Sequence, residues 1–218
     1  MLLVLLIARP EGSSAIDTNR DGLNPEERVG QTPRTIRVGE QRPIDTIAAA
    51  ARLARDGDSI EIDAGDYRGD TAVWTQTRLK IRGVGGRPRL MAAGQAAHRN
   101  GAGIRLARGK LAVRRCVFTD NETGMLVGND PSIVVEIEDS EFGNNGAGDG
   151  QSHNLYVGTI DRLLVTGSYF YSARVGHLLK SRARETSFTT TGSLTSLVEK
   201  RATSSSFQPG AWQWSWEI

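Results

Sequence analysis

Three segments in the second half of the chain share one pattern of apolar and polar positions. In each segment two apolar residues alternate with a polar or small one, and a small residue and a phenylalanine follow at fixed distances. The segments begin at Leu111, Val135 and Leu163, and they end at Phe118, Phe142 and Phe170. Alternation with a period of two predicts β-strands. Because the strands recur every 24 and 28 residues without helices between them, they predict a solenoid of stacked coils.

Stacking places equivalent side chains above one another, about 4.8 Å apart. The three phenylalanines should therefore form one interior column. The small residues Cys116, Ser140 and Ser168 should form a second column, which makes Cys116 a small core residue and not a nucleophile. Asn121 and Asn145 each lie three residues after their phenylalanine, so we expect their side chains to form a ladder of hydrogen bonds between neighbouring coils. Ala173 occupies the equivalent place in the third coil, so we expect the ladder to end at Asn145.

The first part of the solenoid carries the same signals. Strands are expected at Ile60 to Ile62 and at Leu79 to Ile81, where apolar and polar residues alternate. Ile44 to Arg55 carries apolar residues on one helical face and is stopped by Asp56-Gly57. A solenoid end exposes strand edges and core, so this helix is expected to cap the first coil.

Three stretches of the chain resemble a known family. The run GDSIEIDAGDY from Gly57 to Tyr67 resembles the opening coil of right-handed parallel β-helix repeat proteins, which have a pectin-lyase-like fold. Gly148 to Gly158 and Arg174 to Ala183 resemble a bacterial group among them that is usually described only by its fold. The resemblance covers roughly Ile36 to Arg184. It implies an all-β, single-stranded solenoid, and it implies that relatives carry one further coil before Asn100.

The chain is expected to have three parts: a signal remnant and linker at 1–33, the parallel β-helix at 34–184, and an unrelated tail at 185–218. The apolar start Met1 to Ala8 is too short to span a bilayer, and it resembles the core of a secretory signal. We therefore expect a secreted or periplasmic protein; the alternative is a mis-chosen start codon or a frayed tail. Asp17 to Gly22 matches the first half of a calcium loop but lacks its closing glutamate, so this stretch is either a linker or a calcium site.

The tail departs from the solenoid pattern. It is dense in serine and threonine and ends with three of the four tryptophans of the chain, Trp212, Trp214 and Trp216. Read one base out of frame, it permits strand-like residues similar to those of the relatives, which indicates a frameshift near Glu185. The alternative is a genuine Ser/Thr-rich linker. A lost terminal coil would leave strand edges open, so we expect a monomer that is prone to aggregate.

Composition narrows the function classes. With 38% hydrophobic and only 6% aromatic residues, the core must be mainly aliphatic. The net charge of +2, without a run of basic residues, argues against a nucleic-acid partner. The single cysteine excludes an intrachain disulfide.

Two successive coils carry a cluster of polar residues. One coil contributes Asp149, His153, Asn154 and Tyr156, and the next contributes His177, Lys180 and Arg182. Strand alternation directs Leu155 and Val157 to the core, and His153 and Tyr156 are expected on the outer surface. The alternative is that both histidines are turn or core-edge residues bonded to the backbone, and that Lys180 and Arg182 are solvated. Trp74 can stack on a sugar or belong to the core.

The fold class and this cluster together suggest a polysaccharide substrate. β-Elimination on a uronic-acid polymer requires neutralisation of the carboxylate, by Arg182 or a bound cation such as calcium. It also requires a base, Lys180 or His153, and an acid, Tyr156. His177 is a further candidate catalytic residue. The candidate substrate-binding residues are Asp149, Asn154 and Trp74. We therefore expect a lyase or epimerase. The alternatives are a non-catalytic glycan-binding or surface solenoid and an inactive, truncated copy.

Overall fold

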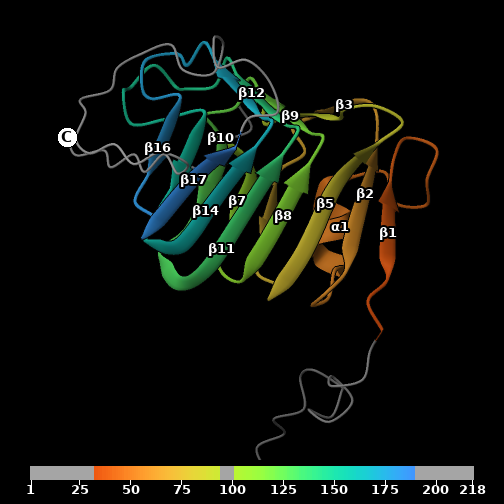
Figure 1. Ribbon diagram of the computed structural model, residues 1–218. Helices are drawn as coiled ribbons and strands as arrows, with labels where there is room; N and C mark the ends of the chain where they lie inside the picture. The colour runs from red at the N-terminus through yellow and green to blue at the C-terminus, as the bar shows by residue number, and fades with distance from the viewer. Residues whose placement is uncertain (1–31, 94–100, 190–218) are drawn as a thin grey trace, which may run out of the picture. The chain divides into compact units, whose positions relative to one another are not determined.

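The structure is a computed structural model that describes residues 32–93 and 101–189 (Figure 1). In this part of the chain seventeen strands form three sheets of seven, five and five strands, and every pair of neighbouring strands is parallel. From the second strand onward, successive strands pass from sheet A to sheet B to sheet C and then return to sheet A one coil further on; the first two strands both belong to sheet A and are joined through the helix. The predicted parallel β-helix is confirmed.

The three sheets divide the strands as follows. Sheet A contains β1 (Thr35–Val38), β2 (Ser59–Asp63), β5 (Arg78–Val84), β8 (Lys110–Arg114), β11 (Asp130–Glu138), β14 (Ile160–Thr166) and β17 (Glu185–Thr189). Sheet B contains β3 (Asp66–Arg68), β6 (Arg89–Met91), β9 (Val117–Thr119), β12 (Glu141–Gly143) and β15 (Tyr169–Tyr171). Sheet C contains β4 (Ala72–Trp74), β7 (Ala102–Leu106), β10 (Thr123–Val127), β13 (Leu155–Val157) and β16 (Leu179–Ser181).

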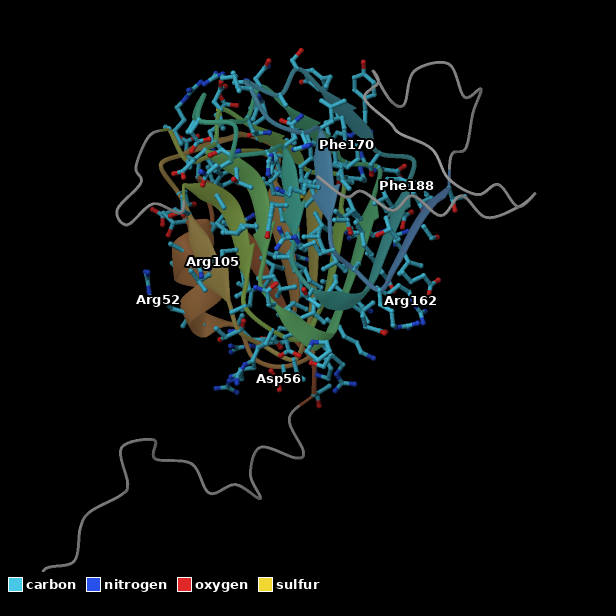
Figure 2. All side chains as sticks on the ribbon, turned by 90° about the vertical axis from the view of Figure 1, so that its left-hand side faces the viewer. Arg52, Asp56, Arg105, Arg162, Phe170 and Phe188 are labelled. Atoms are coloured by element: carbon cyan, nitrogen blue, oxygen red, sulfur yellow. The ribbon has the colours of Figure 1, made fainter. Side chains whose placement is uncertain are left out.

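The two predicted interior columns are present. The rings of Phe118 and Phe142 stack with centroids 4.5 Å apart, and Phe142 and Phe170 stack at 4.9 Å. Phe170 belongs to the coil at the end that faces the viewer in Figure 2. At the turn between sheets A and B, the hydroxyls of Ser140 and Ser168 each accept a backbone N–H from the preceding coil. The repeat thus specifies both the spacing and the register of the coils.

The asparagine ladder is longer than the sequence predicts. Asn121 donates to Oδ1 of Asn145, and Asn145 donates to Oδ1 of Asn154. Asn154 then donates to the carbonyl of Tyr171, so it serves as a third rung in the position where the ladder was expected to end. Its side chain is buried, which corrects its prediction as a substrate-binding residue. Residue spacing did not predict the role of Asn154, because a loop separates it from Asn145 in the sequence.

A single short helix is described at the N-terminal end of the solenoid. The helix α1 (Ile47–Leu53) begins later than predicted, because Thr46 accepts the amide N–H of Ala49 and acts as the N-cap. The helix contacts β1 and β4, the first strands of sheets A and C. It buries Ile47 and Ala50 and leaves Leu53 exposed. The capping role is therefore confirmed, whereas the predicted face was wrong at Leu53.

Two further outcomes concern Trp74 and the end of the solenoid. Trp74 is fully buried in the core, which corrects its prediction as a sugar-stacking residue: in β4 it points inward together with Ala72, whereas Val73 between them points outward. The last described strand, β17, pairs in register with β14. Sheet A thus extends five residues past the expected end at Arg184, and Phe188 packs against the core. Residues 190–218, where the tryptophan-rich end falls, lie outside the described residues.

Candidate functional site

The outer face of sheet C carries one side chain from each of its five strands in a single row. Strand register aligns Val73, Arg105, Leu126, Tyr156 and Lys180, which we call the outer row. Each is partly or largely exposed, whereas the flanking Leu155 and Val157 are buried as the alternation predicts. Because adjacent strands lie about 4.8 Å apart, Arg105 and Lys180 are separated by roughly 14 Å along the row.

This face has a positive charge without local compensation. The five strands of sheet C contain Arg105 and Lys180 but no aspartate or glutamate. Arg182 follows β16 and is exposed. Among the described residues no carboxylate forms an ion pair with these three cations. On sheet A, by contrast, several arginines pair with acids, and Arg37 and Arg82 both contact Glu61 at 3.2 and 2.7 Å.

Tyr156 and Lys180 form the most closely organised part of the row. The Lys180 Nζ atom lies 5.9 Å from the centroid of the Tyr156 ring, a cation–π arrangement between adjacent coils. On another side the Tyr156 ring stacks on His153, with centroids 5.8 Å apart and ring planes 12° apart. The tyrosine is therefore held from two directions, and its phenol lies beside a primary amine.

His153 supports this arrangement from inside the protein. The residue is fully buried, so its predicted exposure was wrong. Its Nδ1 accepts the backbone N–H of His177, which places the proton of the neutral ring on Nε2. Burial, and then the nearby His177 and Lys180, lower its pKa to about 4. A neutral ring with one nitrogen bonded and the other buried cannot exchange protons with a substrate, so the structure favours the alternative of a turn histidine.

His177 lies at the border of the site. Its ring meets His153 edge to face, with centroids 4.9 Å apart, and it is partly exposed. Burial and the Lys180 charge lower its pKa. Its Nδ1 is buried and has no partner among the described residues. Nε2 of His153 is likewise buried without a hydrogen-bond partner, and no third metal-ligating side chain joins the two rings among the described residues.

Asp149 is exposed and lies on the loop that leads to His153. Its carboxylate accepts the backbone N–H groups of Gln151 and Ser152, and these bonds lower its pKa. The residue therefore orders the loop through a turn. The structure describes no contact that makes it a binding group.

The described residues contain no group of three or more histidine, cysteine, aspartate or glutamate side chains that can hold a metal ion. The half calcium loop at Asp17 to Gly22 lies outside them, as do the proposed signal remnant and all of the linker except Thr32 and Pro33. No helix in the described ranges is long and apolar enough to cross a membrane.

Arg105 and Leu126 belong to the outer row, but sequence reasoning did not include them. They sit at outward positions of β7 and β10, between inward-facing Ile104, Leu106, Met125 and Val127. Strand alternation alone would have assigned them outward. Their alignment with Tyr156 depends on the register across coils of unequal length.

Comparisons with known proteins return no match to this chain. No protein-family model matches it, and neither a curated protein nor a solved structure gives a significant match.

Proposed function

We propose that this protein is a polysaccharide-active β-helix that binds an acidic polymer along the outer row of sheet C. The observation that supports this proposal is the positive charge of Arg105, Lys180 and Arg182, which lies on a face whose strands contain no aspartate or glutamate. A polymer that bears carboxylates supplies the counter-charge. The apolar faces of its sugar rings can pack on Leu126 and Tyr156, as ligands do where polar groups surround apolar ones.

The reaction that suits this site is β-elimination at a uronic-acid residue. Arg182 pairs with the carboxylate and stabilises the negative charge that develops there. Lys180 removes the proton from C5, and the Tyr156 hydroxyl protonates the oxygen that leaves C4. The C4–O bond breaks and a double bond forms between C4 and C5. An epimerase would instead return a proton to C5 on the opposite face.

A non-catalytic glycan-binding solenoid is the second candidate. This candidate is favoured by the burial of His153, because neither of its ring nitrogens can reach a substrate. Catalysis would then depend on Lys180 and Tyr156 alone for both proton transfers. The two candidates predict the same ligand and differ in its fate.

The first experiment measures binding of the full chain by affinity electrophoresis in gels that contain polygalacturonate or alginate. We expect retardation by an acidic polymer, and we expect Lys180→Gln to weaken it. Arg114→Gln is the matched control, because Arg114 lies on sheet A and pairs with Glu138. Equal mobility in the presence and absence of both acidic polymers would reject the proposed function.

The second experiment separates cleavage from binding. Formation of the unsaturated uronate is followed by its ultraviolet absorbance. Tyr156→Phe keeps the aromatic ring and should retain binding, but removal of the acid should lower turnover about a hundredfold. Lys180→Arg keeps the charge and removes the base, with the same expected result. Retardation without any absorbance change in the unaltered protein would favour the binding solenoid.

A further inference from the structure

Sheet B carries a pair of tyrosines on its outer face in the last of its strands. Tyr169 and Tyr171 are two residues apart in β15, on either side of the buried Phe170. Their rings are nearly parallel, with centroids 5.1 Å apart and planes 24° apart. Tyr169 is 43% exposed and Tyr171 is half-buried. The pair therefore presents one aromatic surface to solvent on a different sheet from the outer row.

The preceding coil makes room for this pair. Gly143 in β12 is the register partner of Tyr171. A Cβ atom at Gly143 would lie between 2.2 and 2.6 Å from three atoms of the Tyr171 ring, too close for any side chain to be accommodated without movement of the ring. The ring thus leans across the glycine, and the position of the aromatic surface depends on the absence of a side chain there.

The charged residues of sheet B are engaged in ion pairs, in contrast to the cations of sheet C. The strands of sheet B contain two arginines, Arg68 and Arg89, and two acids, Asp66 and Glu141. Both arginines contact Asp66, at 3.1 and 3.4 Å, and Arg87 pairs with Glu141, the register neighbour of Tyr169. The charged residues on the described strands of sheet B thus all have ion-pair partners, and Glu141 is the one on the strand next to the tyrosines.

We propose that Tyr169 and Tyr171 form a second carbohydrate subsite, which takes an uncharged pyranose ring. The apolar face of a sugar packs on the Tyr169 ring, since aromatic rings offer a large rigid contact surface. The hydroxyls of the sugar meet the tyrosine hydroxyls and the Arg87–Glu141 pair. Because Glu141 beside Tyr169 is paired with Arg87, this surface favours a neutral sugar, whereas the outer row selects an acidic one. The two surfaces are separate, so this subsite does not depend on the function proposed for sheet C.

The test is affinity electrophoresis of the full chain in gels that contain a neutral polysaccharide: soluble β-1,4-glucan, xylan or galactomannan. We expect at least one of the three to retard the protein. Tyr169→Ala should weaken that retardation by about five- to tenfold, since the ring interaction is lost. Tyr169→Phe keeps the ring and should bind within about twofold. Mobility unaffected by all three polymers would overturn the proposal.

Two further variants make the test specific. Gly143→Ala forces the Tyr171 ring to move without removing an aromatic group, so it should weaken binding as Tyr169→Ala does. Tyr156→Ala should leave retardation by the neutral polymer unchanged and reduce retardation by an acidic one. Melting temperatures of all variants are compared, so that a loss of fold is distinguished from a loss of binding. A Tyr169→Ala protein that melts normally and is retarded as strongly as the unaltered protein would contradict the assignment.

Discussion

The backbone N–H of His177 donates a hydrogen bond to Nδ1 of His153, 3.1 Å away, across two adjacent coils. This bond links the loop before β13 to the loop before β16 and sets the ring on which Tyr156 stacks. Because the bond requires an unprotonated Nδ1, protonation of His153 breaks it. The stability of this corner of the solenoid therefore depends on the charge of one buried imidazole.

Stability should decrease as the pH falls below about 6.5. The pKa of His153 is about 4 in the folded protein and near 6.5 when unfolded. Its contribution is fully present above about pH 6.5 and is lost towards pH 4, because the unfolded chain then binds the proton more readily. The loss should be on the order of 3 kcal/mol, measured by urea unfolding at several pH values.

The control for the pH dependence is His153→Asn. The asparagine oxygen can accept the same amide N–H, but it does not titrate. This variant should be less stable at neutral pH, because it fills less of the buried space, and its stability should change less between pH 6.5 and 4.5. An unchanged pH slope would show that other groups cause the effect.

Asn145→Ala should be strongly destabilising. The Asn145 side chain accepts two hydrogen bonds from Asn121 and donates to Phe118 and Asn154, all of them buried. Its loss leaves several buried polar groups unpaired, at a cost of about 3 kcal/mol or more in unfolding free energy. Asn144→Gly is the matched control, since exposed Asn144 has a φ of 56° that glycine also adopts. Equal stabilities of the two variants would show that the ladder contributes little.

Val175→Asn should stabilise the protein. Val175 is 63% exposed and has a φ of 49°, a left-handed conformation that a β-branched residue adopts only under strain. Asparagine tolerates this conformation, so we expect about 1 kcal/mol more unfolding free energy. Val73→Asn is the comparison, since it replaces an exposed valine in a strand and should be neutral or destabilising. Thermal unfolding measures both, and a Val175→Asn protein that melts no higher would mean that the strain is negligible.

Binding of an acidic polymer should weaken as the salt concentration rises, and the cations of sheet C should cause this salt dependence. Arg105→Gln removes a cation that has no described ion-pair partner, so it should lower affinity for the polymer and reduce the salt dependence of binding. Arg82→Gln, on sheet A beside Glu61, should change neither. The measurement is affinity electrophoresis at several ionic strengths. A larger effect of Arg82→Gln than of Arg105→Gln would place the binding surface on sheet A.

The sequence by itself determined the coils and their interior columns. Phe118, Phe142 and Phe170 stack, and the small residues line the turn, because residues at equivalent places in a repeat must superimpose when parallel strands pair. Strand parity also placed Tyr156 outward. These features are local and periodic, and a periodic signal survives in the sequence.

Only the tertiary structure decided which residues at the turns are buried and which outer positions align. Asn154 joins the ladder and His153 is buried because the loop between β12 and β13 brings the chain back to Asn145, and no period in the sequence encodes that return. Arg105 aligns with Tyr156 and Lys180 because strand pairing keeps one outward-facing position in register although the coils differ in length. The charge of sheet C likewise became visible only when distant strands lay side by side, since ion pairing is a property of spatial neighbours.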